Sequence, residues 1–93
     1  MPLYTIIAEH DGGTYISQHQ ARIPGSALAK WLQHDDSSNP VHGRRRSTRE
    51  RLSKDLLDPD NKLVPLDGCV RVWCTSESVR GKLLLLNIVE TKA

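Results

Sequence analysis

The 93-residue chain contains no phenylalanine, a single methionine, two tryptophans and two tyrosines. Its hydrophobic core must therefore depend mainly on leucine, isoleucine and valine. No apolar run reaches the roughly 18 residues of a membrane-spanning helix, because the run Leu83–Val89 is short and contains Asn87. A chain of this length rarely holds two cores, so we expect one small domain over residues 1–93, with little room for a deep pocket.

Strong net charge is also absent, since the formal net charge is +2 and the isoelectric point is near 8.7. The overall field of such a chain is too weak to attract nucleic acid to the whole surface. Any electrostatic binding must therefore come from a local cluster of charges.

The only two cysteines, Cys69 and Cys74, are five positions apart. On one extended strand they would point to opposite faces, about 16 Å apart at roughly 3.3 Å per residue, so they cannot form a disulfide there. We expect two buried free thiols in a reducing compartment. Residues Met1–Tyr4 lead into a strand-like pattern without a basic leader, which favours a cytoplasmic location.

A β-hairpin is the strongest local signal, because two β-prone runs flank the turn sequence Asp11-Gly12-Gly13. The two runs are Tyr4–His10 and Thr14–Ala21. A two-residue loop would pair Asp11 with Thr14, and a three-residue loop would pair His10 with Thr14. Both registers stay open from the sequence.

An amphipathic helix is expected from Pro24 to Gln33. Proline suits the first turn of a helix, and Leu28, Trp31 and Leu32 recur at helical spacing. The apolar stripe should pack on the sheet, with Trp31 in the core.

Residues 34–49 contain Val41 as their only aliphatic side chain, so we expect a mobile, arginine-rich loop. Ser47 and Glu50 fit a capping box that begins a second, shorter helix, which Asp58-Pro59 would end. The apolar face of this helix would consist of Leu52, Leu56 and Leu57.

The C-terminal third predicts two more strands, Cys69–Thr75 and Lys82–Glu90, joined by a loop over residues 76–81. In the first, alternation predicts one dry face with Val70, Val72 and Cys74. The last strand is apolar on both faces, so both faces should be covered. One face carries Leu83, Leu85 and Val89, and the other carries Leu84, Leu86 and Ile88.

These elements predict an α+β fold in the order ββααββ. A four-stranded, mostly antiparallel sheet would carry the main helix on one face, with the second helix short. A homodimer formed through the sheet would bury the remaining leucines. The predicted interface consists of Trp73, Leu84, Leu86 and Ile88.

The run Gly12–Gln18, which follows Tyr-Thr-Ile-Ile and precedes Ala-Leu-Ala-Lys-Trp, is similar to a group of short uncharacterised bacterial proteins. This resemblance covers about the first 33 residues and implies no activity. A hairpin leading into an Ala/Leu helix also resembles the N-terminal domain of HicB-type antitoxins. That likeness implies an antitoxin- or immunity-like role, although the chain lacks a C-terminal DNA-binding segment of the helix-turn-helix or ribbon-helix-helix type.

A basic cluster in the middle of the chain gives a local charge of about +5 over eleven residues, Glu50 included. Its members are Arg44, Arg45, Arg46, Arg49, Arg51 and Lys54. Such a cluster can bind nucleic acid or an anionic protein, or it can be a solvated helix start. The cluster contains no aromatic residue to stack on bases, and Asp55, Asp58 and Asp60 neutralise part of its field.

No catalytic or metal-binding signature is present, so we expect neither an enzyme nor a cofactor. His10, His19, His34 and His42 lack metal-ligand spacing. Glu9, His10, Asp11 and His19 could meet at the hairpin tip, but an open sheet should leave them solvated.

The function predicted from the sequence is a non-catalytic binding or structural domain that acts by protein contact through its sheet face or edge. The alternative is nucleic-acid binding through the basic segment Arg44–Arg51.

Overall fold

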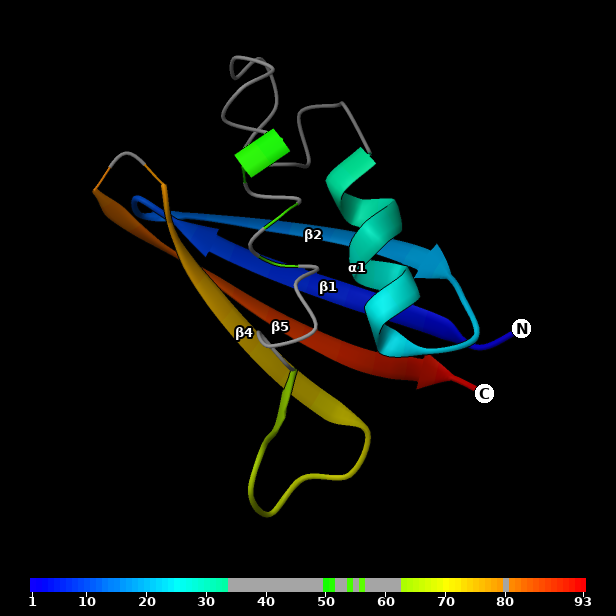
Figure 1. Ribbon diagram of the computed structural model, residues 1–93. Helices are drawn as coiled ribbons and strands as arrows, with labels where there is room; N and C mark the ends of the chain where they lie inside the picture. Colours follow the sequence, from blue (N-terminus) through cyan, green and yellow to red (C-terminus); the bar gives the residue numbers. More distant parts are fainter. Residues whose placement is uncertain (34–49, 52–53, 55, 57–62, 80) are drawn as a thin grey trace.

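A five-stranded antiparallel sheet carries one helix in the computed structural model, which describes residues 1–33, 50–51, 54, 56, 63–79 and 81–93 (Figure 1). The elements are β1 (Leu3–His10), β2 (Gly13–Gln20), α1 (Pro24–Gln33), β3 (Val64–Pro65), β4 (Val72–Val79) and β5 (Lys82–Lys92). No helix of the described residues is long and apolar enough to cross a membrane.

The strand order is β2-β1-β5-β4-β3, so the last strand in sequence lies in the centre of the sheet. β5 pairs with β1 on one side and β4 on the other, and every pairing is antiparallel. Both hairpin turns therefore lie at one end of the sheet, and the two termini lie together at the other end (Figure 1).

The first hairpin is confirmed, but its register differs from both predicted alternatives. His10 pairs with Gly13, so the loop consists of Asp11 and Gly12 alone. These two residues have φ angles of 48° and 82°. Two successive positive φ angles are the mark of the type I′ turn, which matches the twist of the strands and favours Asp-Gly. Gly13 therefore begins β2 and does not belong to the turn.

The helix is confirmed at Pro24–Gln33. Its first turn begins with the amides of Ser26 and Ala27 donating to the carbonyl oxygen of Ile23. The predicted stripe is buried, and Trp31 has no exposed surface. α1 packs against β2, β1 and β5 and crosses one face of the sheet (Figure 1).

The predicted ββααββ order with four strands is wrong, because residues 64–65 add a fifth strand, β3, along β4. The sequence indicated only a turn there, since two residues cannot show alternation. Proline is tolerated in this position because β3 is an edge strand.

α1 is the single complete helix of the described chain, where two helices were predicted. Four residues of the predicted second helix are described, and each has helical backbone: Glu50, Arg51, Lys54 and Leu56. Leu56 belongs to the core. The predicted loop at residues 34–49 lies outside the described residues.

β4 begins and ends later than predicted, and its dry face is the opposite one. Residues 76–79 are strand and not loop, and Val70, expected on the dry face, is 83% exposed. Trp73 and Thr75 pair with Ile88 and Leu86, which places them on the side of α1. The cysteines are free, as predicted, but they are not buried: Cys69 is exposed and Cys74 half-buried.

Candidate functional site

One face of the sheet is occupied by α1 and forms the core of the single chain. The residues of the predicted dimer interface lie on this covered side. Leu84, Leu86 and Ile88 have no exposed surface, and Trp73 packs against the core with its ring centroid 6.2 Å from that of Tyr4. The predicted interface role therefore does not fit the geometry, because Leu84, Leu86 and Ile88 are already fully buried within the single chain.

The opposite face, here named the open face, is not covered by any described helix or strand. Strand alternation and the observed pairings define its members. They are Leu3, Thr5, Ile7 and Glu9 of β1; Thr14, Ile16, Gln18 and Gln20 of β2; Leu83, Leu85, Asn87, Val89 and Lys92 of β5; Val72, Cys74, Ser76 and Ser78 of β4; and Val64 of β3.

The central row of the open face carries no charge. Residue pairing places Ile16, Ile7, Asn87, Cys74 and Val64 side by side across all five strands. Ile16 and Val64, at the two ends of this row, are 58% and 57% exposed. The result is an apolar band with one amide at its centre.

Polar side chains on the row beside this band are bonded to one another. The Gln18 amide donates to the hydroxyl of Thr5 at 3.0 Å, and the Thr5 hydroxyl also contacts the hydroxyl of Thr91. These contacts link β2, β1 and β5 on the open side. They restrain the positions of these polar side chains.

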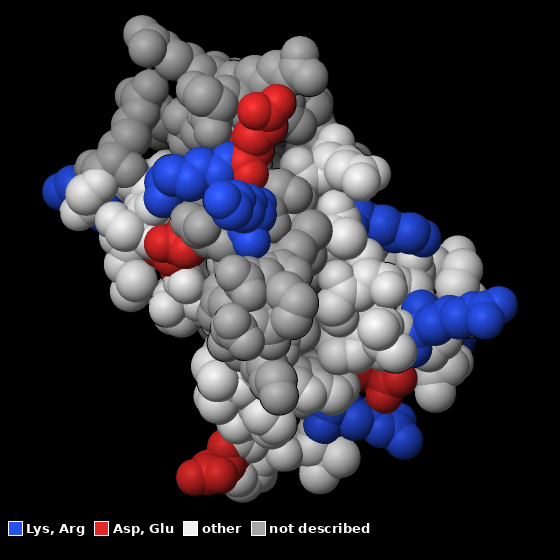
Figure 2. Space-filling model, viewed as in Figure 1, with Lys and Arg blue, Asp and Glu red and all other residues white. Residues whose placement is uncertain are grey.

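Charge on the open face is confined to the two ends of the strands. Among its described members only Glu9, beside the turns, and Lys92, beside the termini, are charged. A register shift between the pairs of Leu3 and Tyr4 leaves Lys92 opposite Leu3. The helix-bearing side differs, because charged side chains of both signs are spread over its described surface (Figure 2).

A depression of about 390 Å³ lies at the turn end of the open face. It is lined by Glu9, His10, Asp11, Gly12, Gly13, Thr14, Leu83 and Leu85. Leu83 is 62% exposed, so the rim of the depression is apolar on one side.

The four side chains considered as an acid-base cluster do not meet. Glu9, His10 and Asp11 line the depression, whereas His19 pairs with Tyr4 towards the other end of β2. The His10 ring is 7% exposed and lies on the covered side, where Nε2 is 3.3 Å from the carbonyl oxygen of Val79. This bond links the ends of β1 and β4, so the ring has a structural role.

A metal centre has no support in the described part of the chain, where no three His, Cys, Asp or Glu side chains are grouped as metal ligands. His34 and His42 lie outside the described residues.

Most of the predicted basic cluster also lies outside the described residues, namely Arg44, Arg45, Arg46 and Arg49. Arg51 and Lys54 are described and exposed. The Arg51 guanidinium donates to the carbonyl oxygen of Ser78 at 3.0 Å. One basic side chain of the cluster is thus tied to the end of β4.

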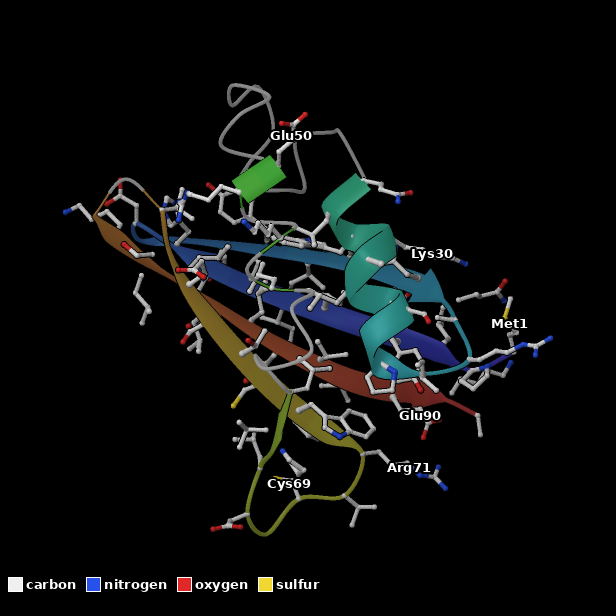
Figure 3. All side chains as sticks on the ribbon, viewed as in Figure 1. Met1, Lys30, Glu50, Cys69, Arg71 and Glu90 are labelled. Atoms are coloured by element: carbon white, nitrogen blue, oxygen red, sulfur yellow. The ribbon has the colours of Figure 1, made fainter. Side chains whose placement is uncertain are left out.

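Beyond the open face, an ion pair joins β5 and the residue that precedes β4. Arg71 Nε lies 3.1 Å from Glu90 Oε2, and the two side chains lie together at the terminal end of the sheet (Figure 3). Burial raises the pKa of the Tyr4 phenol above its ordinary value of 10.0, and the negative charge of Glu90 raises this pKa further.

Comparison with known proteins leaves the geometry as the guide to function. No family model, curated protein or solved structure matches this chain. The resemblances to short bacterial proteins and to HicB-type antitoxins therefore stay predictions.

The sequence did not single out Ile7 and Ile16, which the structure places on the open face. Their signal was the strand alternation of the hairpin. This alternation identifies the open face only when it is known that α1 packs on the face that carries Tyr4 and Ile6.

Proposed function

We propose that this chain is a non-catalytic protein-binding domain whose open face is the contact surface. The observation that carries the proposal is the uncharged row of Ile16, Ile7, Asn87, Cys74 and Val64 across the centre of that face. An antitoxin- or immunity-like role would be one instance of this function.

The energetics of burial favour contact at this surface. Each Å² of apolar surface removed from water contributes about 25 cal/mol, and Leu83, Ile16 and Val64 are all more than half exposed. The backbone groups of the inner strands are already bonded within the sheet, so covering the face desolvates few unpaired polar groups. Charge lies only at the ends, where water can still reach it.

The support for a non-catalytic role is the placement of the titratable side chains at the turn end. His10 is held against the carbonyl oxygen of Val79 and is nearly buried, while Asp11 is an exposed turn residue. The depression therefore presents no histidine paired with a nucleophile or carboxylate in reach of a substrate.

A capture experiment with matched baits tests the proposal. The wild-type chain, Leu85→Lys on the open face and Gln33→Lys at the exposed end of α1 would each be immobilised and exposed to the proteins of the source cell. We expect the wild type and Gln33→Lys to retain a protein that Leu85→Lys loses. Equal retention by all three baits would count against the open face.

The nucleic-acid alternative is tested by a separate binding measurement. Fluorescence anisotropy with labelled RNA and DNA at about 50 mM salt would show tight binding if the basic segment Arg44–Arg51 were the functional site, and this affinity would fall steeply with added salt. Such a result, with no Leu85→Lys effect in the capture experiment, would replace the proposal.

A further inference from the structure

We infer that the occupant of the open face is a second copy of this chain, related by a two-fold axis in a face-to-face homodimer. The inference rests on the proposed function and specifies its partner. Three features of the open face support it: its size, the amide at its centre and the placement of its two charges.

The area of the open face is sufficient for a dimer. Four strands at about 4.8 Å spacing and eight residues at about 3.3 Å rise cover roughly 500 Å² per copy. Two copies would bury about 1,000 Å², which is the lower end of the range for specific interfaces. A dimer of this size should form at micromolar concentrations rather than be permanent.

Asn87 gives the centre of the face a group that can pair with itself. It pairs with Ile7 on one side and Cys74 on the other, so it occupies the middle of the uncharged row. A side-chain amide has both a donor and an acceptor, and a two-fold axis brings equivalent residues together. The two Asn87 amides can therefore bond to each other across the axis, with the apolar neighbours packed around them.

The charges select the direction in which the copies stack. Glu9 lies at the turn end of the open face and Lys92 at the terminal end. An axis perpendicular to the strands that runs along the Asn87 row places Glu9 of one copy over the partner's Thr5, and the partner's Lys92 lies in the next row towards the termini. The long lysine side chain can approach the carboxylate from that row. An axis along the strands would instead bring the two Glu9 ends together, which is unfavourable. We therefore place the strands of the two copies antiparallel.

An alternative dimer would join two sheets edge to edge through β2, which lies at the border of the sheet. Edge pairing would leave the apolar row in water and would not depend on Asn87. A substitution at the centre of the open face therefore separates the two arrangements.

Sedimentation velocity on the full chain from about 1 to 200 μM tests the inference. We expect the wild type to shift from monomer to dimer over this range. Asn87→Asp would place two carboxylates against each other and should weaken the dimer more than about tenfold. Ser26→Asp adds the same charge on the exposed side of α1 and should leave the dimer unchanged. Circular dichroism would verify that each variant is folded.

A charge-swap series provides the second measurement. Glu9→Lys should weaken the dimer because it places a second cation one row from the partner's Lys92, and the double variant Glu9→Lys with Lys92→Glu should restore it. Restoration would support antiparallel stacking, since neither single change restores a pair of opposite charges.

Two results would overturn the inference: a wild type that stays monomeric at 200 μM, or a dimer that Asn87→Asp leaves intact, as an edge-paired dimer would be. The proposed function fails separately. If the wild type is monomeric but still captures a different protein in a Leu85-dependent way, only the dimer is refuted. If the wild type is monomeric and captures no protein in a Leu85-dependent way, both proposals are refuted.

Discussion

At the scale of single residues, neighbouring leucines of β5 have opposite environments. Leu86 is fully buried in the core, whereas Leu83 is 62% exposed. Leu86→Ala should lower the free energy of unfolding by about 2–5 kcal/mol, because it leaves a cavity in the core. Leu83→Ala should cost less than about 1 kcal/mol when measured on the monomer at low concentration. Urea denaturation measures both changes, and equal losses would contradict the assignment of the two faces.

Arg71 has a φ angle of 62°, which is unfavourable for a residue with a side chain. Its ion pair with Glu90 is well exposed on the arginine side and contributes little. Arg71→Gly and Arg71→Ala both remove the ion pair, but only glycine adopts the positive φ angle without steric strain. We expect the glycine variant to be more stable than the alanine variant by about 1 kcal/mol in urea denaturation.

Because of Tyr4, the free energy of unfolding should depend on pH in the alkaline range. Its folded-state pKa is raised by burial and by Glu90, so the folded chain binds the phenolic proton more tightly than the unfolded chain does. This contribution to stability is complete below pH 10 and is lost as the pH rises through the folded-state pKa. Denaturation between pH 8 and 11 should show the loss, and Tyr4→Phe should reduce it. An unchanged pH dependence in Tyr4→Phe would contradict this role.

At the scale of elements, the first hairpin depends on two adjacent glycines for different reasons. Gly12 has a φ angle of 82° with open space around it, so Gly12→Ala should cost about 1 kcal/mol from the backbone alone. A Cβ on Gly13 would lie 2.8 Å from the hydroxyl oxygen of Tyr15, so Gly13→Ala must displace that ring.

A double-mutant cycle separates these two causes. In a Tyr15→Ala background the cost of Gly13→Ala should fall by about 0.5–1 kcal/mol, because the displaced ring is gone, while the cost of Gly12→Ala should stay the same. Thermal denaturation of the six proteins measures this coupling. Equal coupling of both glycines to Tyr15 would contradict the explanation.

The elements that the sequence predicted well are those with a strong local signal. The Asp-Gly turn between β-prone runs indicates a hairpin, and the stripe of Leu28, Trp31 and Leu32 indicates a helix of the observed length. The run that begins at Leu83 is a strand, as the β-branched Ile88 and Val89 suggested.

The elements that the sequence missed depend on long-range pairing. β3 has only two residues, and its hydrogen bonds come from β4 rather than from its own pattern. The dry face of β4 was predicted wrongly, because the alternation of Val70 and Val72 indicated that their face would be buried. The pairing of Trp73 with Ile88 decides otherwise, since it places Trp73 beside the core.

The open face differs from the surface that the sequence predicted as an interface. The apolar character of both faces of β5 predicted that both would be covered, and among the described residues one face is covered within the chain. The sequence could not say which face α1 would take, because that depends on the pairing of β5 with Tyr4, Ile6 and Ala8 of β1. The leucines predicted for the interface are therefore core residues, and their neighbours form the open face.

At the scale of the whole molecule, the described chain is a sheet with one helix on one face. A chain of this length buries only about 60–65% of its unfolded surface, so few side chains are available to cover a second face. A hydrogen bond between His10 and the carbonyl oxygen of Val79 joins strands at the turn end, and the amide of Glu90 donates to the carbonyl oxygen of Arg71 at the terminal end. A preformed surface loses little conformational entropy when it binds.

If the open face binds a second copy, the stability of the fold must depend on protein concentration. A partner that binds only the folded chain adds roughly 1.4 kcal/mol of stability when its free concentration is ten times the dissociation constant. For a chain of this size, that amount raises the melting temperature by several degrees. Calorimetric scans at increasing concentration should show the rise for the wild type and for Ser26→Asp. They should show no rise for Asn87→Asp, and a rise of the same size in all three would place the interface elsewhere on the molecule.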